Sequence, residues 1–138
     1  GLGDGGAHCG SICDGSFTTH MLTHWIRDRK RGDKLELPWV VKAHCHDTAA
    51  AVGLNDRGII APGYKADINV VNLEKMKLHR PEVHYDLPAG GKRLMQLADG
   101  YVATIVSGVP IYINGKSTGA RPGRLVRGNK SKPNFRNH

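Results

Sequence analysis

Asp4 and His8 lie four residues apart in a loop at the start of the sequence, where residues 1–15 include six glycines. Small neighbours leave polar side chains accessible and let a substrate approach the backbone closely. A carboxylate and an imidazole in such a loop suit proton transfer beside a substrate or a metal ion. An aspartate among glycines is also typical of a turn or a helix cap, so these two residues alone leave both interpretations open.

Two cysteines and two histidines form a second candidate site, with the spacing Cys9-x3-Cys13-x6-His20-x3-His24. Zinc modules of the Cys2His2 type need about twelve residues between the two pairs to surround a tetrahedral ion. This chain has six there, and His24 would have to turn away from the apolar face of its predicted helix. The spacing therefore argues against a zinc module.

The segment after the loop predicts three helices. Residues 18–29 carry apolar side chains at helical spacing, on one face: Met21, Leu22, Trp25 and Ile26. A second helix is expected over residues 38–45, because proline suits the first helical position. A third, short helix is expected to be capped by Asp47 or Thr48 and stopped by Gly53.

Beyond Leu54 the chain predicts β-strands, because short Ile- and Val-rich segments alternate with turn sequences. The expected strands are residues 59–61, 67–71, 101–106 and 110–113. Ser107-Gly108-Val109 joins the last two into a hairpin, and Asn114-Gly115 turns the chain again. Residues 73–96 contain two prolines and an Ala-Gly-Gly sequence, so little regular structure is predicted there.

The positive charge is concentrated near the end of the sequence. The net charge is +8, and residues 115–138 hold seven Lys and Arg and no acid, which leaves 13 bases and 12 acids in residues 1–114. A basic patch on a folded face would favour a nucleic-acid or membrane partner. A near-neutral body with a basic, Gly- and Pro-containing end favours a solvated tail instead.

Composition favours a soluble protein of the cytoplasm. No run of about 18 apolar residues and no basic-then-apolar leader is visible, so no membrane partner is expected. Three cysteines among 138 residues are too few for a disulfide scaffold, and this favours a reducing compartment.

Six segments follow one another along nearly the whole chain: Gly3-Asp4-Gly5-Gly6-Ala7-His8, Asp14-Gly15-Ser16-Phe17-Thr18-Thr19, Gly53-Leu54-Asn55-Asp56-Arg57-Gly58, Pro62-Gly63-Tyr64-Lys65-Ala66-Asp67, Asp86-Leu87-Pro88-Ala89-Gly90-Gly91 and Thr118-Gly119-Ala120-Arg121-Pro122-Gly123. In this order they resemble the C-terminal end of the amidohydrolase superfamily, most closely its N-acyl-D-amino-acid deacylase (D-aminoacylase-like) branch. The first resembles the loop after the eighth barrel strand, usually Ser-Asp-x-Gly-Ala-His; Gly3 replaces the serine.

The resemblance implies an α+β fold that combines the C-terminal end of a (β/α)8 metal-dependent hydrolase barrel with part of a small β-sandwich. Residues 1–54 would form the barrel portion, with the loop after strand 8 and the following helices. Residues 55–126 would belong to the small β-domain, and residues 127–138 would be a basic flexible tail. The chain is therefore expected to be a C-terminal fragment of a longer enzyme.

The same resemblance implies that Asp4 is the catalytic aspartate and that His8 contacts the substrate. Zinc is the expected cofactor of the full-length enzyme, held by residues of earlier barrel strands. Asp4 could add one weak bond to it, and no tightly bound zinc is expected on this chain by itself.

The implied function is hydrolysis of the C–N bond of an N-acyl amino acid or a related small amide by an amidohydrolase, with the isolated chain expected to be inactive. The alternative is a non-enzymatic binding fragment whose basic tail contacts nucleic acid or another acidic surface, and a steep salt dependence would reveal it. No nucleic-acid partner is expected under the first interpretation. Self-association is expected, because helix faces and strand edges would lack the elements that cover them in a whole barrel.

Overall fold

The computed structural model describes residues 3–134 of the chain. The chain divides into two compact units, each assembled from two stretches of sequence. Unit 1 combines Gly1–Leu37 with Asn72–Gly100, and unit 2 combines Pro38–Val71 with Tyr101–His138. The long-range partners of the N-terminal loop are therefore found in residues 72–100.

The helical part of unit 1 is one continuous helix. It begins as α1 (Phe17–His20) and widens into η1 (Met21–Asp28), where the Arg29 N–H reaches back five residues to the His24 carbonyl at 2.8 Å. The helix predicted over residues 18–29 is confirmed. Its buried positions are Thr19 and Thr23, and the Thr23 hydroxyl donates to the Thr19 carbonyl at 3.2 Å, so the buried hydroxyl has a partner inside the helix.

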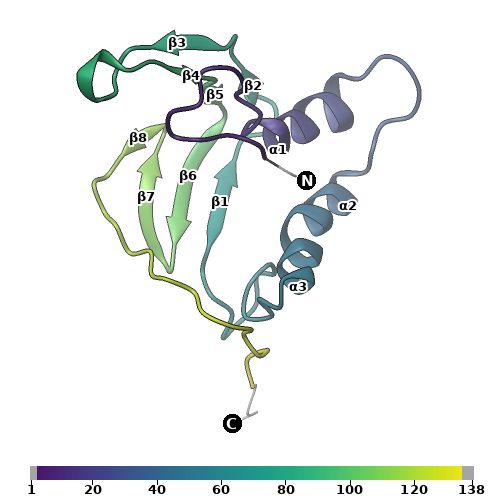
Figure 1. The fold of residues 1–138 in the computed structure, drawn as a ribbon. Coiled ribbons are helices and arrows are strands. Elements are labelled where there is room, and N and C mark those ends of the chain that lie inside the picture. Colours follow the sequence, from purple (N-terminus) through teal and green to yellow (C-terminus); the bar gives the residue numbers. More distant parts are fainter. Residues whose placement is uncertain (1–2, 135–138) are drawn as a thin grey trace. The chain divides into compact units, whose positions relative to one another are not determined.

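The second stretch of unit 1, residues 72–100, forms a nested antiparallel hairpin (Figure 1). The inner pair is β3 (Glu82–His84) with β4 (Arg93–Met95), and the outer pair is β2 (Lys77–Leu78) with β5 (Ala98–Asp99). The prediction of little regular structure over residues 73–96 is wrong. Neither proline interrupts a strand: Pro81 precedes β3, and Pro88 opens the single turn η3 (Pro88–Gly90).

Met76 forms the centre of unit 1, with an exposed fraction of 1%. The Arg27 guanidinium, from η1, donates to the carbonyls of Leu73, Glu74 and Met76. These bonds satisfy three carbonyls of the turn that precedes β2. Gly100, directly after β5, lies close to the Met76 backbone: a Cβ at Gly100 would lie 2.6 Å from Met76 Cα.

The helical part of unit 2 is also continuous, through α2 (Leu37–Lys42), η2 (Ala43–Asp47) and α3 (Thr48–Ala51). Two separate helices with a cap at Asp47 or Thr48 were expected, and this is wrong: Asp47 makes no capping bond. The Thr48 hydroxyl instead donates to the His44 carbonyl at 2.7 Å, within the helix. The helix stops at Gly53, which adopts φ +74°, as predicted.

The β part of unit 2 is a four-stranded antiparallel sheet in the order β1-β6-β7-β8. Its strands are β1 (Ile68–Val71), β6 (Tyr101–Val106), β7 (Val109–Ile113) and β8 (Lys116–Ser117). Ser107 and Gly108 both have positive φ, 51° and 79°, which is the turn that matches the twist of a two-residue hairpin. The three predicted strands in this sheet are confirmed, and the predicted Asn114-Gly115 turn joins β7 to β8.

Residues 59–61 do not form a strand, contrary to prediction. Ile59 lies in a bend, Ile60 and Ala61 have no regular structure, and the Tyr64 N–H closes a turn on the Ala61 carbonyl at 3.2 Å. Ile60 is 88% exposed, so the apolar character that suggested a strand reflects no burial in this structure.

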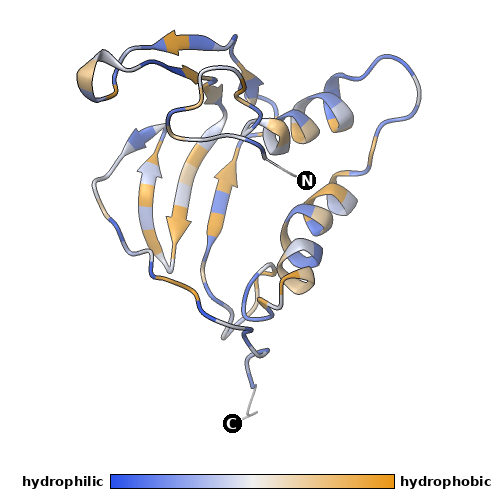
Figure 2. Cartoon of the chain, viewed as in Figure 1, coloured by the Kyte–Doolittle hydropathy of each residue, from blue (hydrophilic) through white to orange (hydrophobic). Residues whose placement is uncertain are grey.

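Helices and antiparallel strands together fit the α+β class, and the barrel end, the sandwich and the predicted boundaries at residues 54 and 126 stay predictions. Apolar and polar residues are interspersed along most elements (Figure 2). Among the described residues the fully buried apolar side chains are Val40 and Met76. No helix within residues 3–134 combines the length and the apolar character needed to cross a membrane.

Candidate active-site loop

Asp4 lies on a loop that folds back on itself. Its backbone pairs with that of Asp14 in a short antiparallel bridge, so residues 5–13 form a closed excursion. The glycines around Asp4 let the two backbone segments approach: a Cβ at Gly3 would lie 3.5 Å from Gly15 Cα, and one at Gly5 would lie 3.4 Å from Gly15 N. Asp4 itself is exposed, so its carboxylate is open to a small molecule.

The far end of the loop is attached to the hairpin of unit 1. The Cys9 N–H closes a turn on the Gly6 carbonyl at 3.1 Å, and the Cys9 carbonyl accepts a hydrogen bond from the Leu94 N–H of β4 at 2.8 Å. His8 lies in this turn, is exposed, and makes no side-chain hydrogen bond to another described residue. The loop thus presents an aspartate and a histidine, both with accessible side chains.

The near end of the loop, where it enters α1, is held by the side chain of Gln96. The Ser16 hydroxyl donates to Gln96 Oε1 at 2.5 Å, and the Cys13 thiol lies 3.8 Å from the same oxygen. Gln96 Nε2 donates to the His79 carbonyl at 2.8 Å. Nothing in the sequence pointed to Gln96, since its partner Ser16 is 80 residues away.

Cys9 is a thiol of the loop whose pKa is lowered. Hydrogen bonds from the backbone of Ser11 and Ile12 and from the Ser11 side chain lower the pKa of the Cys9 thiol, while the negative charge of Asp4 opposes this. Cys9 Sγ lies 3.9 Å from Ser11 Oγ. The thiol is free, so the loop also carries a reactive group that can report on its environment.

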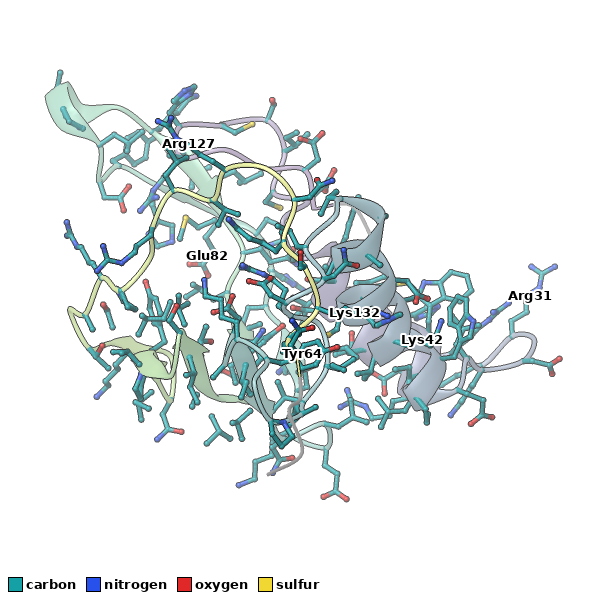
Figure 3. All side chains as sticks on the ribbon, turned by 90° about the horizontal axis from the view of Figure 1, so that it is seen from below. Arg31, Lys42, Tyr64, Glu82, Arg127 and Lys132 are labelled. Atoms are coloured by element: carbon teal, nitrogen blue, oxygen red, sulfur yellow. The ribbon has the colours of Figure 1, made fainter. Side chains whose placement is uncertain are left out.

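His20 and His24 stack on one another along the helix, with ring centroids 5.0 Å apart and planes 5° from parallel. His24 meets the edge of Trp25, and the Arg29 guanidinium lies 4.5 Å from the centroid of that ring. A shallow hollow of about 500 Å³ lies beside this stack, bordered by Asp28, Lys30 and Arg31. Arg31 extends away from the ribbon (Figure 3), so the hollow is an open feature of the surface.

Unit 2 contains an ion-pair cluster formed by two of the six segments that carry the family resemblance, residues 53–58 and 62–67. Arg57 pairs with Asp56 at 2.9 Å and with Asp67 at 3.0 Å, and its side chain is only 16% exposed. Asp67 also accepts the Ser107 N–H at 2.8 Å, so it holds the turn of the β6–β7 hairpin. The guanidinium of Arg57 lowers the pKa of Asp56. This cluster is structural and lies outside the loop.

The basic segment after residue 115 begins in β8 and Thr118, which bond to β7, and is bonded to unit 2 again at Lys130. Lys130 forms a parallel bridge with Leu54, and its backbone exchanges hydrogen bonds with Gly53 and Asn55 at 2.8 and 3.1 Å. Arg127 and Lys132, on either side of this bridge, are labelled in Figure 3. Residues 135–138, which include Arg136 of the predicted tail, lie outside the described residues.

Residues 1–112 match the family model described as "Amidohydrolase family". The match covers most of the chain and includes the whole Asp4 loop. The chain belongs to the amidohydrolase family. No curated protein and no solved structure matches it. A hydrolase of the amidohydrolase superfamily, as the resemblance implied, is therefore confirmed at the level of the family, whose members are generally metal-dependent.

The described part of this amidohydrolase does not fit a metal centre. Within residues 3–134 no three His, Cys, Asp or Glu side chains lie close enough together to hold an ion, whereas zinc takes about four ligands and at least three from protein. This applies to the Cys9, Cys13, His20 and His24 set as well. Asp4 offers a single carboxylate, and its predicted catalytic role and that of His8 at the substrate stay predictions.

Proposed function

We propose that this amidohydrolase chain is the C-terminal part of a zinc-dependent cytoplasmic enzyme that hydrolyses the C–N bond of N-acyl amino acids or related small amides. The observation that supports it is the placement of Asp4. The residue that matches the catalytic position of the D-aminoacylase branch is an exposed carboxylate on a loop fixed at both ends. The three free thiols suit the reducing compartment.

In the proposed reaction Asp4 moves one proton. It accepts a proton from the water that attacks the amide carbonyl, and the water oxygen bonds to the carbonyl carbon. It then returns that proton to the leaving nitrogen as the C–N bond breaks, which gives a carboxylic acid and a free amine. A positioned carboxylate contributes about 10² to 10⁴ in rate by such transfer. Within residues 3–134 no metal centre is present, and the proton is carried by the Asp4 carboxylate.

His8 is proposed to bind the substrate. It shares the loop with Asp4, its side chain is exposed, and it makes no hydrogen bond within the described chain. An imidazole in this setting can donate to the carboxylate of an N-acyl amino acid, a group that every member of the substrate class carries. The loop would then hold the substrate by its carboxylate, with the neighbouring amide close to Asp4.

Release of free amine from a panel of small amides tests this function. The full-length enzyme that carries this chain is incubated with N-acetyl-D- and N-acetyl-L-amino acids, with cyclic amides and with acetyl esters. The proposal expects amine release from N-acetyl amino acids, with the D series faster. Turnover of the esters alone, with no amine released from any amide of the panel, would refute the proposed substrate class.

A further inference from the structure

We propose that Gln96 is a positioning residue for the Asp4 loop: through Ser16 and Cys13 it fixes the segment on which Asp4 rests, without touching Asp4 itself. The inference rests on the proposed function for its catalytic meaning. It assigns a role to residues 72–100, which carry none of the predicted site residues.

The amide of Gln96 can be held in only one orientation. Its NH2 group donates to the His79 carbonyl at 2.8 Å, so the oxygen must be the end that faces the loop. That oxygen lies 2.5 Å from Ser16 Oγ and 3.8 Å from Cys13 Sγ. A side chain with a donor at one end and an acceptor at the other is needed to make both sets of contacts.

Ser16 is the residue through which Gln96 contacts the start of α1. Ser16 occupies the N-cap position of α1, where a serine hydroxyl ordinarily accepts a backbone N–H of the first turn, yet it makes no capping bond. Its hydroxyl points to Gln96 instead. The Ser16 backbone is in the helical region, with φ −81° and ψ −3°, and its hydroxyl oxygen also lies 3.4 Å from the Cys13 carbonyl, so the Ser16 side chain contacts both Gln96 and the segment that carries Asp14.

Gln96 is itself supported on the outer strand pair of the hairpin. The His79 N–H donates to the Leu97 carbonyl at 3.0 Å, and His79 Nε2 pairs with Asp99 Oδ2 at 2.9 Å. These bonds hold the carbonyl that accepts from Gln96. The amide therefore transmits the position of the β2–β5 pair to the start of α1, next to the N-terminal loop (Figure 1).

The connection to Asp4 is short. Cys13 and Ser16 flank Asp14 and Gly15, and Asp14 is the residue that bridges Asp4. A shift of residues 13–16 therefore moves the backbone of Asp4 with it. A misplacement of about 1 Å at a reacting group can lower the rate about 100-fold, so loss of the Gln96 contacts should affect turnover more than substrate binding.

The experiment compares three variants: Gln96→Met, Ser16→Ala and the double variant. Lys92→Met is the control on the same hairpin, because Lys92 is exposed and its side chain makes no hydrogen bond or ion pair with another described residue. Two readouts are taken: kcat and KM for an N-acetyl-D-amino acid in the full-length enzyme, and the rate at which Cys13 reacts with an aromatic disulfide in a Cys9→Ala, Cys45→Ala background.

The proposal expects Gln96→Met and Ser16→Ala each to lower kcat by about 10- to 100-fold with little change in KM. It expects Cys13 to react at least several-fold faster in Gln96→Met, and the double variant to be no worse than the more severe single variant, because one bond is lost in each case. Lys92→Met should behave like the wild type in both readouts.

An unchanged Cys13 rate in Gln96→Met, with the circular dichroism spectrum of the wild type, would overturn the positioning role. A faster Cys13 with unchanged kcat, or additive single effects, would overturn it as well. If the wild type hydrolyses no amide, the proposed function fails, and the thiol rates still decide whether Gln96 holds the loop.

Discussion

Replacement of Gly100 by alanine should destabilise unit 1 through a collision with backbone. Gly100 has φ +94°, and a Cβ there would lie 2.6 Å from Met76 Cα, 2.8 Å from Met76 N and 3.0 Å from the Asn72 carbonyl oxygen. None of these atoms belongs to a flexible side chain. The turn of Asn72 and Met76, which the Arg27 guanidinium also holds, would have to move away from the end of β5.

Two terms lower the free energy of unfolding of Gly100→Ala, and a third term partly offsets them. The left-handed backbone costs an alanine about 1–2 kcal/mol, and forcing a methyl group into a filled place costs about 1–3 kcal/mol. Alanine leaves the unfolded chain less conformational freedom than glycine does, which stabilises the folded state by about 0.4–1 kcal/mol. Gly100→Ala should therefore lower the free energy of unfolding by about 3 kcal/mol.

Gly90→Ala is the matched control, because Gly90 also has a positive φ, +70°, but has open space around its Cβ position. It should cost only about 1 kcal/mol. Urea unfolding of the chain is followed by Trp25 fluorescence in a Trp39→Phe background, so that the signal reports unit 1. The midpoint of Gly100→Ala should fall about 1–2 M below that of the control. Equal midpoints would refute the close approach of Gly100 to Met76.

Two further predictions concern unit 2 and the exposed apolar surface. Arg57→Met should cost about 2 kcal/mol at pH 7, between the values for exposed and buried pairs, with Arg80→Met near neutral. Arg57 lowers the pKa of Asp56 below the ordinary 3.8, so this stabilisation is fully present above pH 3.8 and is lost as the pH falls through the lower pKa of the folded state. The decrease in urea midpoint caused by Arg57→Met should therefore be smaller at pH 3 than at pH 7. An equal decrease at both pH values would contradict the pairing. The chain should also self-associate, because large apolar side chains such as Ile60 and Leu125 are 88% and 76% exposed. Sedimentation equilibrium at micromolar concentration tests this. A monomer that unfolds cooperatively would contradict the prediction and would show that the chain buries enough apolar surface without a partner.

The elements that depend on near neighbours could be predicted from the sequence. The helix through Trp25 follows from apolar spacing within one segment. The β6–β7 hairpin follows from Ser107-Gly108, whose positive φ values suit a tight turn between two Val- and Ile-rich strands. The loop of Asp4 and His8 could be found because glycines surround them, and the family match covers it.

The features that depend on distant residues could not be predicted. The β2–β5 pair joins Lys77 to Asp99 across a second hairpin, and strands of two residues leave no periodic pattern. Apolar residues at 59–61 resembled a strand, although burial and pairing, which decide that assignment, are absent for the exposed Ile60. Gln96 stands in no recognisable motif, and its importance depends on the approach of Ser16 in space.

Turnover of Asp4→Asn in the full-length enzyme tests most directly whether Asp4 is the proton-transferring carboxylate of an amide hydrolase. Asp14→Asn is the control, because the backbone of Asp14 bridges that of Asp4 across the loop and the proposed mechanism gives the Asp14 carboxylate no proton transfer. For an N-acetyl-D-amino acid, Asp4→Asn should lower kcat by about 10² to 10⁴ with the fold unchanged, while Asp14→Asn keeps most of the activity. Retained turnover in Asp4→Asn, or an equal loss in both variants, would show that Asp4 only shapes the loop.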